Sequence, residues 1–195
     1  MDRLKQQIRF IIEIDKLKGI VRQNYLADGS RKEDDAEHSW HLALMCAILA
    51  EYANEKIDVL KTMKMLLIHD LVEIDAGDTY AYDTTGASES KRERELAAAE
   101  RIFKLLPEDQ AKEYRALWDE FEENASPEAK FAATLDRLQP FLLNSASNGK
   151  SRKEHDVSFS QVLRRNEVTP DGSKILWDFQ YEMMKEEVRK GNLRK

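Results

Sequence analysis

The chain has 195 residues, enough for one domain with a single core, and its 31 Lys and Arg against 37 Asp and Glu give a formal net charge of −6. This acidic balance offers no field that attracts a polyanion, so we expect no nucleic acid polymer as a partner. The sequence contains no apolar span of membrane length and no signal-peptide pattern. We therefore expect no membrane association and a cytoplasmic location, where the single cysteine, Cys46, is a reduced and buried thiol.

Helix-forming residues dominate the composition, only seven Gly and four Pro interrupt it, and no strand-like alternation appears, so we predict an all-α fold. Apolar residues at helical spacing predict a first helix that ends near Gly19. A loop over 24–35 is followed by helices over about 35–53 and 58–73. The segment 74–90 is polar, aromatic and aperiodic, and connections of this length are often functional.

The second half of the chain continues the helical pattern. Pro107 can open a helix, and Ser126-Pro127-Glu128 predicts an N-cap followed by proline in the first turn of the helix that carries Asp136. The other predicted elements are a helix over 90–106, a polar and basic loop over 145–156, and helices over about 158–166 and 173–190.

Three of the four histidines have a carboxylate beside them, and two of these pairs, Glu37-His38 and His69-Asp70, lie in predicted helices. Neutral imidazole and anionic carboxylate ligands suit divalent Mn, Fe, Co, Ni or Zn. Adjacent residues of a helix point about 100° apart, so His69 and Asp70 can reach one ion only near a helix end or an interhelical cleft. Glu73 lies on the same helix face and is a candidate acid or base.

Each of these features has a structural alternative when it is taken alone. A histidine in an amphipathic helix is more often a hydrogen-bonded residue than a metal ligand. Asp136 lies within an apolar helical stretch, where a carboxylate needs a cation or hydrogen-bond donors. Arg137 or Lys130 could fill that need without any metal.

Three segments in this order resemble the HD-domain metal phosphohydrolases, and within them the branch of the 5′-deoxynucleotidases. The segments are RKEDDAEHSWH over 31–41, LLIHDLVEIDAGD over 66–78, and PEAKF over 127–131 with LDR over 135–137. The pattern H…HD…D is shared by the whole superfamily, whereas the EHS box together with HDxxExxxGD is more specific to this branch. The resemblance spans most of residues 15–145.

The resemblance implies a compact helical HD domain over 1–195, with a core over about 15–145 and a helical extension over about 146–195. It implies one divalent metal ion, Mn, Co, Fe, Ni or Zn, with four ligands: His38, His69, Asp70 and Asp136. Glu73 would act near the leaving group or the attacking water, and Asp78 would contact the sugar or orient the substrate. Arg22 would bind the phosphate, with a surface arginine as the alternative.

The implied reaction is release of phosphate from nucleoside or deoxynucleoside 5′-monophosphates, and a homodimer is expected because compact helical enzymes often assemble symmetrically. One alternative is another HD reaction, hydrolysis of a guanosine polyphosphate or of a cyclic nucleotide, although such relatives usually carry additional histidines or a distinct acidic pair. Another alternative is a regulatory module that binds a nucleotide without turning it over. Loss of a ligand would mark such a module, and all four ligands are present.

Other residues near the motifs have open or structural roles. We expect Arg31 and Glu33 to form a salt bridge that shapes the rim of the pocket. His41, one turn after His38, either supports the metal site or packs in the core. The tyrosines of segment 74–90 and Trp40 could stack on a base, although packing is the more common role for each.

Overall fold

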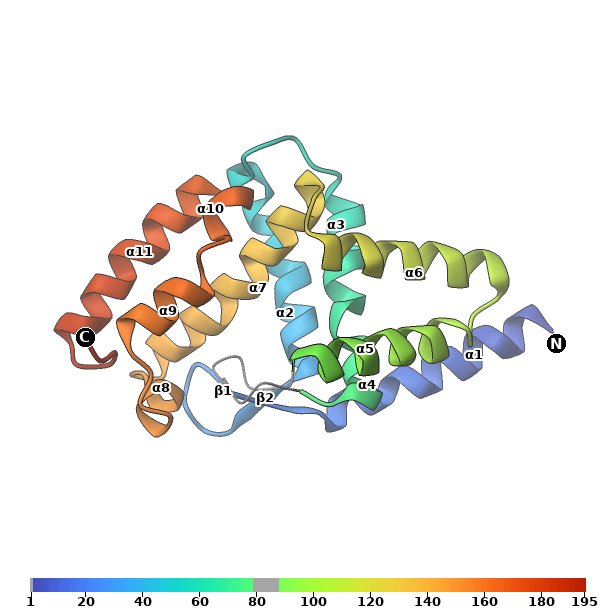
Figure 1. Ribbon diagram of the computed structural model, residues 1–195, viewed down its shortest axis with the longest axis horizontal. Coiled ribbons are helices and arrows are strands. Elements are labelled where there is room, and N and C mark those ends of the chain that lie inside the picture. Colours follow the sequence, from blue (N-terminus) through green and yellow to red (C-terminus); the bar gives the residue numbers. More distant parts are fainter. Residues whose placement is uncertain (1, 79–87) are drawn as a thin grey trace.

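Helices form nearly all of the regular structure in this computed structural model, which describes residues 2–78 and 88–195 (Figure 1). The predicted all-α fold class is confirmed. The α-helices are α1 (Arg3–Ile14), α2 (Asp35–Leu49), α3 (Val59–Ile68), α4 (Glu73–Ala76), α5 (Ser88–Phe103), α6 (Glu108–Glu123), α7 (Pro127–Ala146), α8 (Lys150–Glu154), α9 (Phe159–Arg165), α10 (Thr169–Gly172) and α11 (Lys174–Arg189). Short 3₁₀ helices continue three of them: η1 (Asp15–Gly19), η2 (Ala50–Tyr52) and η3 (His69–Val72).

Side-chain caps set where the two central helices begin. Asp34 accepts a hydrogen bond from the backbone N–H of Glu37, and the Glu37 carboxylate accepts one from the backbone N–H of Asp34, which fixes the start of α2. Ser126 accepts from the N–H of Ala129, and Pro127 occupies the first turn of α7, as the sequence predicted. These two starts place His38 and Asp136 on their helices.

The predicted loop over 24–35 and the expected lack of strands are wrong, because β1 (Val21–Tyr25) and β2 (Lys32–Asp34) form an antiparallel hairpin. Its turn contains Gly29 at φ 70°, a backbone conformation that glycine adopts without strain. The Asp28 carboxylate accepts from the N–H of Ser30 and stabilises this turn. Strands of five and three residues are too short for an alternation of polar and apolar residues to be recognised.

The predicted loop over 145–156 is also wrong, because α7 continues to Ala146 and α8 follows after a tight turn. Gly149 has φ 69°, and a side chain at this position would place its Cβ 2.3 Å from the carbonyl oxygen of Asn192. The short helix α10 was not predicted either. Within segment 74–90, Tyr80 and Tyr82 lie outside the described residues.

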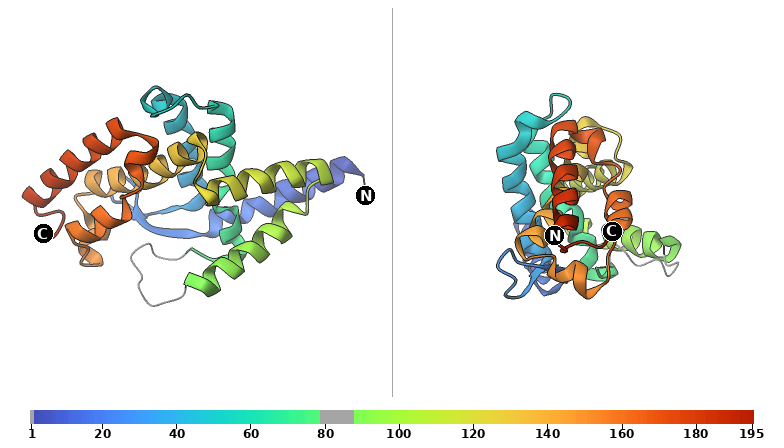
Figure 2. Two further views of the ribbon diagram at one scale, coloured as in Figure 1. Left: turned by 45° about the horizontal axis from the view of Figure 1, so that its top comes forward. Right: turned by 90° about the vertical axis from the view of Figure 1, so that its left-hand side faces the viewer.

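Helix α7 crosses the middle of the molecule and packs against helices on both sides (Figure 1). One apolar cluster, with Leu42, Leu66 and Leu135 at its centre, joins α2, α3 and α7. A second joins α5 and α6 to α1 and η3, and a third, which includes Phe141 and Met184, holds the C-terminal helices against α7. The two ends of the chain lie at opposite ends of the molecule in Figure 1 and in the left-hand view of Figure 2.

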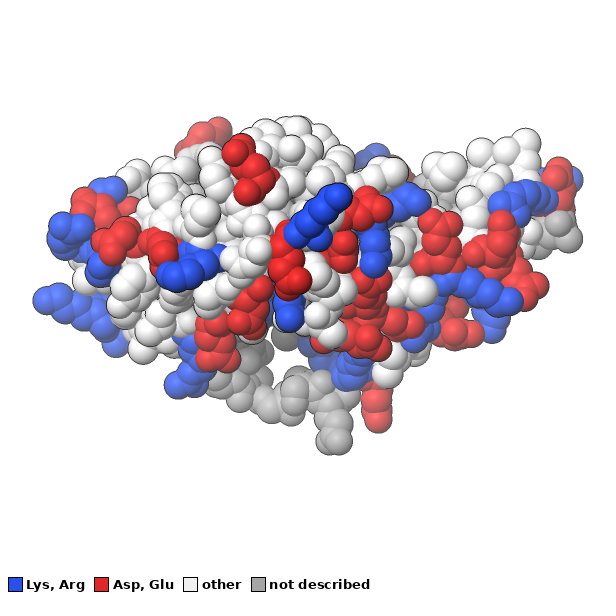
Figure 3. All heavy atoms as spheres, turned by 90° about the horizontal axis from the view of Figure 1, so that it is seen from above, with Lys and Arg blue, Asp and Glu red and all other residues white. Residues whose placement is uncertain are grey.

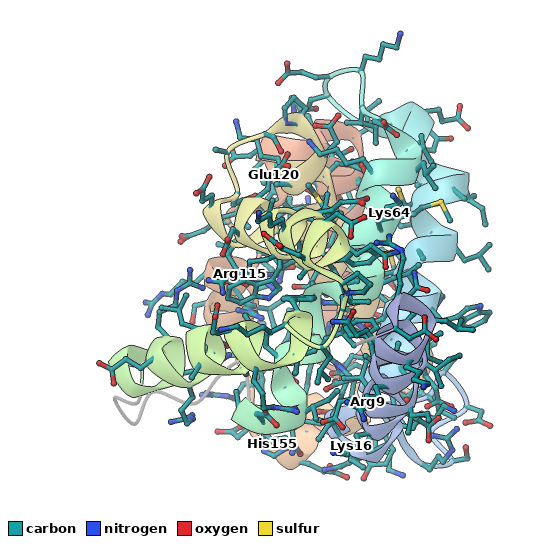
Figure 4. The ribbon with its side chains drawn as sticks, turned by 90° about the vertical axis from the view of Figure 1, so that its right-hand side faces the viewer. Arg9, Lys16, Lys64, Arg115, Glu120 and His155 are labelled. Atoms are coloured by element: carbon teal, nitrogen blue, oxygen red, sulfur yellow. The ribbon has the colours of Figure 1, made fainter. Side chains whose placement is uncertain are left out.

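Charged side chains of both signs are interspersed on the face seen in Figure 3, which fits the small net charge of the chain. Ion pairs tie α3 to α6, with Lys61 Nζ 2.6 Å from Glu120 Oε1 and Lys64 Nζ 2.9 Å from Glu113 Oε1. Figure 4 labels one partner of each pair, Glu120 on α6 and Lys64 on α3. Among the described residues, every helix falls short of the length and apolarity that a membrane crossing needs.

Candidate metal centre and pocket

The His69-Asp70 pair lies directly after the last residue of helix α3. After Ile68 the backbone tightens into the 3₁₀ turn η3, so the two side chains project from a helix end, as their adjacency required. The ring of His69 is almost fully buried, and its Nδ1 donates to the carbonyl oxygen of Leu66 at 2.8 Å. The lone pair of Nε2 therefore faces away from that carbonyl.

Four predicted ligands meet at one point, from α2, η3 and α7. His38 Nε2 lies 3.0 Å from Asp136 Oδ1 and 3.9 Å from Asp70 Oδ2. His69 Nε2 lies 3.1 Å from Asp70 Oδ2 and 3.7 Å from Asp136 Oδ1. Asp136 also pairs through its second oxygen with Arg137. A pairing with arginine in place of a metal therefore accounts for only one of the two oxygens of Asp136.

These donor atoms fit a divalent ion. Two ligand atoms about 2.1 Å from a metal lie roughly 3.0 Å apart at a right angle and roughly 3.4 Å apart in a tetrahedron. The four nitrogen-to-oxygen separations in the cluster, 3.0 to 3.9 Å, lie close to these values. His69 Nε2 is buried and makes no hydrogen bond, which leaves a polar atom that a metal would satisfy.

The electrostatics of the cluster favour a positive charge at its centre. Burial lowers the pKa of His38 to about 4, so this ring is neutral at neutral pH. Burial also acts to lower the pKa of His69, but Asp70 and Asp136 raise it well above its ordinary value. The same two carboxylates that stabilise a protonated His69 can stabilise a metal ion instead.

Arg22 on β1 lies beside the cluster and is not a surface arginine. Its side chain is only 14% exposed, and one guanidinium nitrogen donates to Asp35 Oδ1 at 2.7 Å and to Asp70 Oδ2 at 2.8 Å. Asp35 is fully buried and was missed by the sequence reasoning. It stands in an acidic run at a helix start, where carboxylates usually act as caps, and here its neighbour Asp34 is the cap.

Glu73 and Asp78 also lie at this site. Ligand atoms of Asp35, Asp70 and Glu73 lie within 4.8 Å of one another. Burial and the neighbouring carboxylates of Asp70 and Asp35 raise the pKa of Glu73 to about 11, so Glu73 carries a proton at neutral pH. Asp78 lines the same pocket, and burial raises its pKa.

The pocket has a volume of about 450 Å³, within the range of sites for small molecules. Arg22, Asp70 and Glu73 line it beside the ligand cluster, and further lining residues come from α5 to α9. Asn144 and Arg152 are among these, so residues of the C-terminal third of the chain help to enclose the pocket.

The expected salt bridge between Arg31 and Glu33 is wrong. Arg31 pairs with Glu37, whereas Glu33 is 2% exposed and accepts a hydrogen bond from Gln139 Nε2 at 2.6 Å. His41 Nδ1 lies 3.2 Å from the same amide nitrogen. Gln139 was also missed, although its position three residues after Asp136 puts it on the same face of α7.

Comparison with known proteins decides the family, because the HD domain family model matches residues 14–177. The chain belongs to the HD domain family. The family predicted from the motifs is therefore confirmed, and the matched region contains every candidate site residue.

Relatives and solved structures agree with this membership. Human 5′-deoxynucleotidase HDDC2 is 30% identical over 136 residues, which cover 69% of this chain and 65% of the human protein. The chain thus spans less than two thirds of that relative. A structure described as a predicted metal-dependent phosphohydrolase from Magnetospirillum magnetotacticum MS-1 is 49% identical, covers 99% of this chain and 96% of its own, and superposes with a TM-score of 0.95. A conserved hypothetical protein from Pyrococcus furiosus, 25% identical, covers 93% and 99% with a TM-score of 0.63.

Proposed function

We propose that this HD-domain protein is a metal-dependent phosphohydrolase that releases phosphate from nucleoside or deoxynucleoside 5′-monophosphates. The observation that carries the proposal is the convergence of two imidazole nitrogens and two carboxylate oxygens, with nitrogen-to-oxygen separations of 3.0 to 3.9 Å, at a pocket that also holds a fixed arginine. The names of the human relative and of the Magnetospirillum structure support the same chemistry.

The proposed ligands of one divalent ion are His38, His69, Asp70 and Asp136. The donor set of two nitrogens and two oxygens suits Mn, Co, Fe, Ni or Zn. A bound ion of this kind would lower the pKa of water and withdraw charge from a phosphoryl oxygen. The protein's own contribution is to hold the four donor atoms together in a buried place before any substrate enters.

Arg22, Glu73 and Asp78 would handle the substrate. Asp35 and Asp70 hold the Arg22 guanidinium in place, so it needs little reorganisation to face the oxygens of a phosphate. Glu73 carries a proton at neutral pH in the metal-free protein, and a Glu73 that keeps this proton could give it to the departing 5′-oxygen. Asp78 would accept a hydrogen bond from a sugar hydroxyl.

The geometry of α7 supports a nucleoside beyond the phosphate. Asp136 and Asn144 both line the pocket, and eight residues of helix separate them by about 12 Å. This separation is comparable with the length of an extended nucleoside monophosphate. Asn144 donates to Asn24 at 2.9 Å, so two amide groups stand where a base would lie.

The test is phosphate release from a panel of ribo- and deoxyribonucleoside monophosphates by metal-stripped protein refilled with Mn, Co, Ni, Zn or Mg. His69→Ala and Asp136→Ala should abolish release, whereas His155→Ala, which changes an exposed histidine outside the pocket, should not. Bound metal without release from any monophosphate would overturn the substrate class. Failure of the wild type to bind metal would overturn the site.

We also propose a homodimer in which an apolar face of α2 and α3 meets its symmetry mate. Trp40, Leu44 and Ile48 follow one another at four-residue spacing on α2 and are 45 to 62% exposed, and Leu60 and Leu67 on the adjoining α3 are 66% and 46% exposed. Figure 2 places α2 on an outer side of the molecule. An exposed two-helix apolar face of this kind suits a self-complementary interface.

Sedimentation velocity tests the dimer. Ile48→Glu should yield monomers, whereas Ile175→Glu, at an equally exposed apolar position on α11, should leave the dimer intact. A wild type that sediments as a monomer would contradict the proposal.

The domain boundary and the location remain proposals of the same kind. We propose that 1–195 act as one domain, because Phe141 of α7 packs with Val157, Val162 and Met184 of the C-terminal extension.

We propose that the protein acts in the cytoplasm, where the buried thiol of Cys46 stays reduced.

A further inference from the structure

A buried glutamine connects the candidate metal centre to a buried carboxylate. Gln139 is fully buried on α7, one turn after Asp136. Its Oε1 lies 3.0 Å from His38 Nδ1, and its Nε2 lies 2.6 Å from Glu33 Oε1. Glu33 is contributed by β2 and His38 by α2, which are consecutive in the chain, so the contact joins these two elements to a residue of α7 that lies 106 and 101 positions later.

The two partners of the amide fix its orientation. Burial raises the pKa of Glu33 to about 7, and above this pH its carboxylate oxygens only accept, so the group of Gln139 that faces Glu33 is the NH₂. The second hydrogen of that NH₂ has His41 Nδ1 at 3.2 Å as its acceptor. The oxygen of the amide is therefore the atom that faces His38.

This orientation dictates the state of the His38 ring. Since the Gln139 oxygen cannot donate, the proton of a neutral His38 belongs on Nδ1. The lone pair then lies on Nε2, the atom 3.0 Å from Asp136 Oδ1 and in the cluster of proposed ligand atoms. Without a cation between them, this lone pair and the Asp136 carboxylate would repel each other.

We propose that Gln139 is a positioning residue, which holds His38 in the Nδ1–H tautomer with Nε2 toward the metal, and that Glu33 in turn fixes the Gln139 amide. The inference rests on the proposed function, because it takes His38 as a metal ligand. The role of Gln139 is to orient a ligand, and it makes no contact with the substrate. Hydrogen bonds of this kind to ligating histidines raise metal affinity by fixing the ring before the ion arrives.

Zinc affinity measured by competition with a chromophoric chelator tests the role of Gln139. Gln139→Leu removes the hydrogen bonds of the amide to His38, Glu33 and His41 and should weaken zinc binding by roughly 10- to 100-fold. Thr134→Val is the matched control, because Thr134 is equally buried on α7 but donates to the carbonyl oxygen of Thr169, on the side of α10. This control should keep wild-type zinc affinity even if it lowers the melting temperature.

An exchange of the two side chains tests the role of Glu33. Gln139→Glu alone places two carboxylates in contact and should also weaken zinc binding. The double variant Glu33→Gln with Gln139→Glu restores a donor facing an acceptor and still presents an oxygen to His38 Nδ1. It should recover zinc affinity to within a few-fold of wild type.

Proton NMR of the zinc-loaded protein gives a readout that a general loss of stability would not move. The His38 Nδ1–H should appear as a slowly exchanging ring proton in the wild type and in the double variant, and should lose its protection in Gln139→Leu. Unchanged zinc affinity and an unchanged resonance in Gln139→Leu would overturn the inference, as would equal weakening by Thr134→Val. A wild type that binds no zinc would instead overturn the proposed metal site.

Discussion

Replacement of Glu73 by Gln should stabilise the metal-free protein at neutral pH although it removes the proposed proton donor. Glu73 is 8% exposed, and burial with the carboxylates of Asp70 and Asp35 raises its pKa from 4.5 to about 11. A raised pKa means that the stabilising contribution of this group is complete below pH 4.5 and is lost as the pH rises toward 11. Glutamine is neutral throughout and avoids this loss.

The magnitude follows from the pH and from the ordinary pKa. At pH 7 Glu73 keeps its proton in the folded protein but loses it in the unfolded chain, where its pKa is 4.5. This difference lowers the free energy of unfolding by up to about 3 kcal/mol, at 1.36 kcal/mol per pH unit. At pH 5 the same cost is below about 1 kcal/mol. Any folded pKa well above 7 gives the same result at pH 7, so the exact value of this pKa has little influence.

Urea unfolding in the presence of a chelator, at pH 5, 6, 7 and 8, measures the effect. The free energy of unfolding of Glu73→Gln relative to wild type should rise by about 1.4 kcal/mol per pH unit. Glu55→Gln, at an exposed position, is the control and should show no such slope. A difference independent of pH, or a wild type that is the more stable protein at pH 8, would refute the reasoning.

Three further outcomes are expected. Gly172→Ala should cost about 1 to 3 kcal/mol of unfolding free energy in urea, because its Cβ would lie 2.2 Å from the carbonyl oxygen of Lys130, whereas Gly19→Ala, with open space around it, should cost far less. Native Cys46, fully buried and with its pKa raised to about 11 by burial, should resist a thiol reagent at pH 8 and react only after unfolding; complete reaction of the native protein on mixing would contradict this. Zinc or manganese should raise the melting temperature of wild type but not of Asp136→Ala, and an equal rise in both would argue against the proposed ligand.

The sequence predicted those helices whose ends carry local signals. Ser126 and Pro127 marked the start of α7 because a cap and a proline act on the first turn alone. The sequence did not predict the β1–β2 hairpin or α8, which contact each other in the folded protein. Lys150 of α8 donates to the carbonyl oxygen of Gly29 at 2.9 Å and lies 3.9 Å from the ring centre of Tyr25. A contact between residues more than 120 positions apart leaves no trace in local spacing.

The same distinction holds within the candidate site. His38, His69 and Asp136 could be chosen from the sequence because few side chains have ligand chemistry and because their order matched a family pattern. Glu33 and Gln139 carry no such mark, since a glutamate before a helix and a glutamine within one are ordinary residues. Their roles exist only after β2, α2 and α7 have packed together.

The carboxylates of the site should make the metal-free protein less stable than the metal-bound protein. Asp35, Asp70, Glu73 and Asp136 lie among two arginines, Arg22 and Arg137, and two histidines, His38 and His69. Burial and the neighbouring carboxylates keep a proton on Glu73, and the carboxylates of Asp70 and Asp136 raise the pKa of His69. In the metal-free protein His69 supplies positive charge because it takes up a proton. A bound divalent ion would supply this positive charge instead. The residues proposed for catalysis should therefore lower the stability of the empty protein, and metal binding should restore it. The Glu73→Gln measurement and the melting temperature with metal test the two halves of this account separately.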